Sequence, residues 1–267
     1  MNAPHPALFI GHGSPMQAIE PTRYTEAWTR IGAALPRPRA ILAVSAHWYT
    51  RGTAVTAQPR PRTIHDFHGF PAALYAMQYP APGDPQLAAH VAQLLAPTAV
   101  ALDTGWGLDH GSWSVLHYMY PQHDVPVVQL SIDGTQDARA LFELAQRLAP
   151  LRDEGVLVLG SGNVVHNLRA LQPPELPAPP WARQFNDAAR RALLADRPLS
   201  LVDYANLDTG AAMSVPTPEH YLPLLYVLAL RRANEPLSLP IDGLEMGALS
   251  MLSVVIGAQL PEFAPAN

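Results

Sequence analysis

The chain has 267 residues, of which 48% are hydrophobic and 15% are charged, which is the composition of a folded globular protein and excludes a disordered chain. The formal net charge is −5, and the arginines form no continuous basic stripe, which argues against nucleic acid as a partner. The chain contains no cysteine and no lysine, which excludes disulfides, thiolate metal sites, cysteine nucleophiles and Schiff-base chemistry. Metal or acid–base chemistry near neutral pH therefore falls to carboxylates and to the 11 histidines.

The first residues show no basic region followed by a long apolar run, so they predict no signal peptide. The longest apolar stretches, residues 221–230 and 251–260, are too short to cross a bilayer. We therefore expect a cytoplasmic protein without a membrane partner, present as a monomer or a small homo-oligomer. No repeat and no shift in composition divides the chain, which predicts one domain over residues 1–267.

Short apolar runs alternate with helical patterns along the chain. Helices are predicted where apolar residues recur at three- and four-residue spacing, at residues 21–35, 85–96, 137–151 and 180–195. Strands are predicted at residues 7–10, 40–44, 125–132, 156–159 and 251–256, with an added antiparallel strand at 53–58. This alternation indicates an α/β fold, with a mostly parallel central sheet and helices on both faces. In such sheets ligands bind beyond the carboxyl ends of the strands, where we expect the functional site.

Three histidines lie just after predicted strands. His12 follows the first strand in the motif GHGS, His47 follows the second in SAHW, and His166 comes shortly after a later strand in GSGNVVHN. Alone, His12 is equally well explained as a turn residue, and His47 is better explained as a packed core residue. The carboxyl ends of parallel strands share one edge of a sheet, however, so together they predict a cluster of imidazoles there. Such a cluster suits Zn, Fe, Ni or Cu.

Two further histidines have informative neighbours. His110 lies between two glycines and next to Asp109, which suits an exposed imidazole oriented by an adjacent carboxylate. For His220 the pattern predicts Thr217 as a helix N-cap and Pro218 as the first helical residue. His220 would then lie in the first turn of an apolar helix, either as a neutral metal ligand or simply as the start of a buried helix.

The carboxylates nearest in sequence to these histidines are Asp109, Asp208 and Glu219. His65 and His68, in a loop with aromatic residues, are predicted either to line a pocket or to lie on the surface. The GSGN run also permits a phosphate-binding loop, although the chain lacks the P-loop lysine. The remaining histidines have no special context and are interpreted as structural or solvent-exposed, namely His5, His90, His117 and His123.

Six motifs occur in order between residues 11 and 226: GHGSPM, SAHW, TIHDFHGFP, WGLDHGSW, GSGNVVHNLR and TPEHYLPLLY. Together they resemble the class III extradiol ring-cleavage dioxygenases, and most closely the branch of the 4,5-DOPA extradiol dioxygenases. The resemblance implies a non-haem Fe(II) enzyme that uses O₂ to open a small aromatic diol, a catechol, next to its hydroxyl pair. Its product would be a ring-opened semialdehyde.

The resemblance also assigns roles to the histidines of these motifs. It implies that His12 and His47 are metal ligands and that His220 is a further metal-associated histidine. His166 matches a residue that acts as acid–base catalyst in some members and is associated with the metal in others. His110 matches a histidine that takes part in proton transfer.

Two points stay open in the sequence. Many members of the superfamily complete the metal site with a glutamate, so either Glu219 or His220 faces the metal. An all-histidine site also suits Zn(II), which leaves a zinc-dependent hydrolase and a non-catalytic binding protein of the same fold as alternatives to an Fe(II) dioxygenase. A carboxylate-bearing substrate would require an arginine or a nest of backbone amides in the pocket, and no arginine can be placed there from the sequence.

Overall fold

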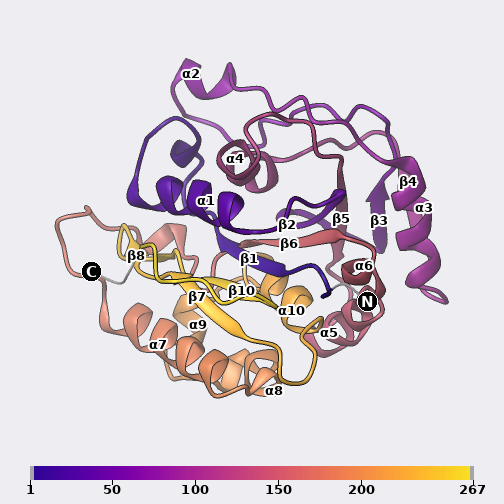
Figure 1. Ribbon diagram of the computed structural model, residues 1–267. Helices are drawn as coiled ribbons and strands as arrows, with labels where there is room; N and C mark the ends of the chain where they lie inside the picture. Colours follow the sequence, from indigo (N-terminus) through magenta and orange to yellow (C-terminus); the bar gives the residue numbers. More distant parts are fainter. Residues whose placement is uncertain (1–2, 265–267) are drawn as a thin grey trace.

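The computed structural model describes residues 3–264 (Figure 1). The assignment of residues 1–267 to one domain stays a prediction. The strands of the main sheet are β1 Ala7–Gly11, β2 Ala40–Thr50, β3 Thr53–Thr56, β4 Val100–Asp103, β5 Val127–Asp133, β6 Val156–Gly162, β7 Leu237–Ile241 and β10 Ser253–Ile256. A separate two-stranded sheet consists of β8 Leu244–Glu245 and β9 Leu249–Ser250.

The helices connect these strands. They are α1 Arg23–Ala34, α2 Ala72–Tyr75, α3 Pro85–Leu94, α4 His110–Met119, α5 Ala138–Gln146, α6 Pro150–Asp153, α7 Pro180–Leu194, α8 Pro198–Val202, α9 Ala211–Ser214 and α10 Leu222–Leu228. Short 3₁₀ helices are η1 Pro15–Ala18, η2 Leu168–Ala170 and η3 Tyr204–Asn206.

The main sheet has eight strands in the order β4-β3-β5-β2-β6-β1-β10-β7. Its central strands β5, β2, β6 and β1 pair in parallel, which confirms the predicted mostly parallel sheet. Toward one edge β3 pairs antiparallel with β5, as expected for the added strand, and toward the other β10 pairs antiparallel with β1. The carboxyl ends of the central strands therefore lie at one edge of the sheet.

Alternate residues of the central strands face two apolar layers. In β2, Leu42 and Val44 belong to the core that includes residues of α5, α7 and α10, whereas Ile41 and Ala43 belong to the core that includes residues of α1 and α4. Figure 1 shows the sheet between these two groups of helices. Because the central strands are buried on both faces, they consist of nearly continuous apolar runs, as parallel strands usually do.

Some predicted boundaries differ from the structure. The helix predicted over residues 137–151 is divided into α5 and α6, and Pro150, which has no N–H to donate, is the first residue of α6. Strand β2 continues to Thr50, so His47 lies within the strand and not after it. The pairing register of β2 with β5 is irregular between Val44 and Tyr49, and irregularities of this kind re-aim side chains.

Between residues 3 and 264, no helix is both long enough and apolar enough to cross a membrane.

Candidate metal centre

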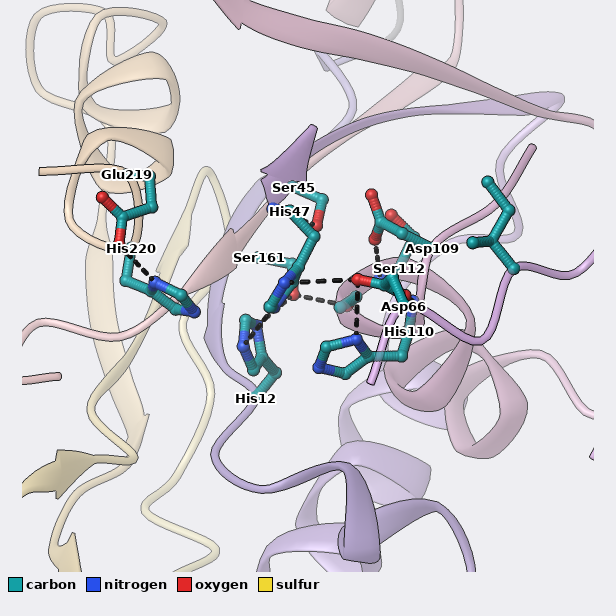
Figure 2. A network of polar contacts seen from close by, with 12 residues as sticks. His12, Ser45, His47, Asp66, Asp109, His110, Ser112, Ser161, Glu219 and His220 are labelled. Carbon is teal, nitrogen blue, oxygen red and sulfur yellow. Dashed lines mark hydrogen bonds and ion pairs between the residues drawn. The ribbon is translucent and has the colours of Figure 1, made fainter. Parts of the chain in front are cut away.

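Four histidines from different elements converge at the carboxyl edge of the sheet (Figure 2). His12 follows β1, His47 lies in the last part of β2, His110 begins α4, and His220 lies just before α10. The His12, His47 and His220 rings each offer a nitrogen, and these nitrogens all lie within 4.8 Å of one another. The structure therefore brings together three of the four histidines predicted as metal-associated.

The hydrogen bonds of His12 define which of its nitrogens carries the proton. The Ser161 hydroxyl donates to the carbonyl oxygen of Gly111, so its oxygen is left to accept a hydrogen bond from His12 Nδ1, which lies 3.0 Å away. With the proton on Nδ1, the Nε2 atom of neutral His12 carries a lone pair. This Nε2 lies 3.2 Å from Nε2 of His47.

Carboxylates determine in the same way which nitrogen carries the proton in the rings of His47 and His220. Asp66 Oδ2 lies 3.3 Å from His47 Nδ1, and Glu219 Oε1 lies 3.3 Å from His220 Nδ1. An ionised carboxylate only accepts hydrogen bonds, so both Nδ1 atoms are the donors and both Nε2 atoms carry lone pairs. His220 Nε2 is buried without a hydrogen-bond partner among residues 3–264.

These three imidazoles fit a divalent transition-metal ion. Two imidazole nitrogens that bind one tetrahedral Zn²⁺ at about 2.0–2.1 Å are about 3.3 Å apart, close to the separation between His12 and His47. A bound cation would also satisfy the buried Nε2 of His220, which costs free energy when it is left unpaired. The donor set of three neutral imidazoles suits Fe, Zn, Ni or Cu.

The electrostatic setting keeps these rings neutral. Burial and, after it, the proximity of other histidines lower the pKa values of His12, His47 and His220 well below the usual value for histidine. Near neutral pH the three rings are therefore uncharged, which is the protonation state that binds metal ions.

Asp66, which the sequence did not single out, is the carboxylate partner of His110. Its Oδ2 lies 3.0 Å from His110 Nδ1, and its Oδ1 accepts a hydrogen bond of 2.9 Å from the backbone N–H of His110. Burial acts to raise the pKa of Asp66, but the hydrogen bond and charge of His110, and then the charge of His47, outweigh it and hold this pKa at about 2. Asp66 lies inside the TIHDFHGFP motif, and that motif was the one signal that pointed to it.

The prediction that Asp109 orients His110 is wrong. Asp109 is the N-cap of α4 and accepts from the Ser112 N–H at 3.1 Å, and it also accepts from the side-chain amide of Gln129. Burial and then the charge of Asp66 raise the pKa of Asp109 to about 6. His110 itself is only 4% exposed, so it is not the exposed imidazole that the flanking glycines suggested.

His220 is held differently from the sequence prediction. Helix α10 begins at Leu222, and Thr217 does not cap it but donates from its hydroxyl to Glu219 Oε1 at 2.7 Å. The backbone N–H of Asn163 donates to the carbonyl oxygen of His220 at 2.8 Å. This bond uses the backbone N–H of Asn163, and the three residues before it, Gly160 to Gly162, belong to strand β6. The backbone N–H groups of the GSGN run are therefore not arranged as a phosphate-binding loop.

His166 lies beside the three-imidazole group and not within it. Its ring stacks on that of His220, with centroids 3.4 Å apart and planes 5° from parallel. A second possible ligand group consists of His166, Glu219 and His220. Burial lowers the pKa of His166 to about 4. Of the two residues left open by the sequence, His220 is the one grouped with His12 and His47, and Glu219 lies on the Nδ1 side of His220.

Aromatic side chains form one wall of the centre. The ring of Phe67 meets that of His110 edge-on, with centroids 5.5 Å apart. His65 packs on Phe67, and its Nε2 lies 2.9 Å from the carbonyl oxygen of Met77, whereas His68 is exposed.

Asp208, one of the carboxylates near the histidines in sequence, accepts a hydrogen bond from the backbone N–H of Gly210 in its own turn.

A cavity of about 460 Å³ with mixed polar and apolar lining lies beside the segment that follows β1. It is lined by segments that follow β1, β6 and β7, and Arg23 and Glu245 are among its lining residues. Arg23 donates to the hydroxyl of Tyr24 at 2.6 Å. A Cβ on Gly13, the residue after His12, would lie 3.1 Å from Glu245 Oε2, so this cavity adjoins the chain segment that carries His12. The tertiary structure thus places Arg23 in a cavity beside the segment that carries His12, which the sequence could not do.

The fold and the imidazole cluster are those expected for a class III extradiol dioxygenase. Residues 3–237 match the family model described as the catalytic LigB subunit of aromatic ring-opening dioxygenase, and the chain belongs to this family of enzymes, as its motifs predicted.

Relatives with assigned names are similar over nearly their whole length. The chain is 54% identical over 257 residues to the 4,5-DOPA dioxygenase extradiol of Escherichia coli (strain K12), covering 94% of each chain. It is 37% identical over 250 residues to the 4,5-DOPA dioxygenase extradiol of Beta vulgaris, covering 91% of this chain and 93% of the relative. The crystal structure of an uncharacterized protein from Escherichia coli K12 has a TM-score of 0.82 and 49% identity, over 95% of this chain and 100% of that chain.

Proposed function

We propose that this enzyme is a non-haem Fe(II) dioxygenase that uses O₂ to open the ring of a catechol with a charged tail, of which DOPA is an example. The observation that carries the proposal is the convergence of three unprotonated Nε2 atoms, from His12, His47 and His220, at the carboxyl edge of the sheet. The names of the relatives support the choice of DOPA. A cytoplasmic location and a monomeric or small homo-oligomeric state stay predictions.

His12, His47 and His220 are the residues that would hold the metal. Fe(II) in this position would supply a redox centre for O₂ and a Lewis acid that favours the deprotonated form of the diol. Holding the diol and O₂ at one centre would remove much of the entropic cost of their encounter.

His110 is positioned to accept a proton from a catechol hydroxyl. Its Nδ1 donates to Asp66, so its Nε2 is left to accept. Once protonated, the same Nε2 can return the proton to the opening ring, because histidine acts as base and acid near neutral pH. His166, stacked on His220, is the second candidate for proton transfer.

The surroundings suit an aromatic ring with a polar tail. Phe67 supplies an apolar wall beside His110. In the cavity beside the segment that carries His12, Arg23 provides a guanidinium for a carboxylate. Glu245, which lines the same cavity, accepts from Gln17 Nε2 with both of its oxygens.

Anaerobic loading of the metal-free protein tests this proposal. After loading with Fe(II), O₂ and a panel of catechols that includes DOPA and caffeate are added, and O₂ consumption and a yellow ring-opened product are recorded. We expect both with Fe(II) and neither with Zn(II), which has no redox chemistry. His47→Ala should lose activity, whereas the matched control His90→Ala, in a residue that pairs with Glu154 at the surface, should keep it. The proposal fails if the Fe(II)-loaded enzyme consumes no O₂ with any of the catechols. Turnover of another substrate by the protein loaded with zinc alone would favour a hydrolase.

A further inference from the structure

We propose that Asp66 is a positioning residue, whose single carboxylate orients the metal-binding ring of His47 and the proton-transferring ring of His110 at the same time. This inference rests on the proposed function for the roles of the two histidines. The orientation itself is a property of the protein that can be measured separately.

One oxygen of Asp66 faces both rings. Oδ2 lies 3.3 Å from His47 Nδ1 and 3.0 Å from His110 Nδ1, while Oδ1 accepts from the backbone N–H of His110 at 2.9 Å (Figure 2). The two rings are close neighbours, with centroids 3.9 Å apart. Because the carboxylate accepts at Nδ1 of each ring, it leaves Nε2 of each ring without a proton. The tautomers of the two rings are therefore coupled through one side chain.

The loop that carries Asp66 is fixed on the element that begins with His110. The backbone N–H of Ile64 donates to the carbonyl oxygen of Leu108 at 2.7 Å, and Trp113 Nε1 donates to the carbonyl oxygen of Ile64 at 2.8 Å. These bonds attach the loop on both sides of His110. The carboxylate of Asp66 therefore has a defined place, and its side chain is only 16% exposed.

Among residues 3–264, no other carboxylate is placed to replace Asp66. Asp109 is directed at Ser112 and Gln129, and Glu219 serves His220. An asparagine at position 66 would have a single acceptor oxygen and an amide that donates. With its oxygen toward the rings, the amide group would face the backbone N–H of His110, and with its amide group toward the rings it would face both Nδ1–H groups. In either orientation a donor meets a donor, so the side chain would have to leave its place between the rings, and loss of such a supporting partner typically lowers metal affinity by about 10- to 100-fold.

The experiment compares Asp66→Asn with wild type and with the control Asp187→Asn, an exposed position on α7. Co(II) affinity is measured by competition with a chelator, and histidine tautomers of the metal-free proteins are read from ¹⁵N NMR. We expect Asp66→Asn to bind Co(II) about 10- to 100-fold more weakly, to lose at least one Nδ1–H tautomer signal, and to lower kcat on a cleaved catechol more than it raises KM. Asp187→Asn should match wild type.

Asp66→Glu, which keeps both carboxylate oxygens, should bind Co(II) more tightly than Asp66→Asn and less tightly than wild type. It replaces Asp66→Asn in the experiment if that variant fails to fold. The inference is overturned if the folded Asp66 variants retain wild-type Co(II) affinity and wild-type tautomers. If Co(II) affinity and tautomers change as expected but wild type opens no catechol, the proposed function fails while the positioning role of Asp66 stands.

Discussion

Nε2 of His12 and Nε2 of His47 lie 3.2 Å apart, although strand β6 separates their strands in the sheet. Ser161 accepts from Nδ1 of the first ring and Asp66 from Nδ1 of the second, so the two Nε2 atoms present lone pairs to each other. Without a cation this juxtaposition is unfavourable, and the fold sustains it through the contacts on the outer sides of both rings. Cation binding should therefore be coupled to the stability of the whole domain.

Metal binding is expected to raise the melting temperature. Zn(II) or Co(II) at about 100 times its Kd should stabilise the native state by about 2.7 kcal/mol, a rise of roughly 5–10 °C for a domain of this size. Differential scanning calorimetry with and without a chelator measures the shift. His47→Ala should largely abolish it, and a shift of equal size in this variant would place the metal elsewhere.

Replacement of His110 should separate catalysis from metal binding. In His110→Gln the three grouped imidazoles remain, so metal content should stay near that of wild type. The loss of the proton-transferring group should lower kcat by about 10²- to 10⁴-fold. Steady-state kinetics and metal analysis of the same preparation test this, with His90→Gln as control. A loss of metal that accounts for the loss of activity would contradict the assigned role.

Replacement of Arg23 should affect only substrates that carry a carboxylate. Arg23→Ala is expected to lower kcat/KM for DOPA by about 10- to 100-fold, because a hydrogen bond to a charged group contributes about 1.5–3 kcal/mol. A catechol without a charged tail should be cleaved as by wild type. Arg183→Ala, on the exposed surface of α7, is the control. An equal loss on both substrates would show that Arg23 supports the structure and does not bind the tail.

The ion pair of Arg152 and Glu235 predicts a pH-dependent contribution to stability. Arg152 is fully buried and donates to both Glu235 oxygens at 2.8 Å. Burial acts to raise the pKa of Glu235, but the hydrogen bonds from Arg152 and from the backbone of Arg232, together with the charges of both arginines, outweigh it, so this pKa lies below its usual value. A depressed pKa means that the stabilisation is complete above the unfolded-state value of about 4.3 and is lost as the pH falls through the lower folded-state value.

Glu235→Gln should therefore cost about 3–5 kcal/mol at pH 7, because it leaves a buried guanidinium without its charge partner. The difference from wild type should shrink as the pH falls below about 4, where the wild-type carboxyl is itself protonated. Urea unfolding of both proteins at several pH values measures this difference. A difference that does not change with pH would indicate that packing, and not the charge, carries the stabilisation.

Much of the fold follows from local patterns in the sequence. The apolar runs of the central strands and the amphipathic spacing of α1, α5 and α7 depend on near neighbours, so they can be interpreted without the tertiary structure. The placement of His12 directly after β1 followed from the same patterns, as did the expectation of a histidine cluster at the carboxyl edge.

The partners of the histidines depend on contacts between distant segments. Asp66 and His110 are 44 residues apart in the chain, whereas adjacent Asp109 turns away because an N-cap side chain is directed at its own helix. The stacking of His166 on His220 and the position of Arg23 in the cavity beside the His12 segment likewise depend on how loops from different strands pack. The sequence by itself determined the class of the sheet and six of its strands, but not β4 or β7, together with the edge that carries the site and the residue types available there. Only the tertiary structure decided which carboxylate orients each imidazole, because hydrogen bonds between loops are set by packing across the molecule and leave no local pattern in the chain.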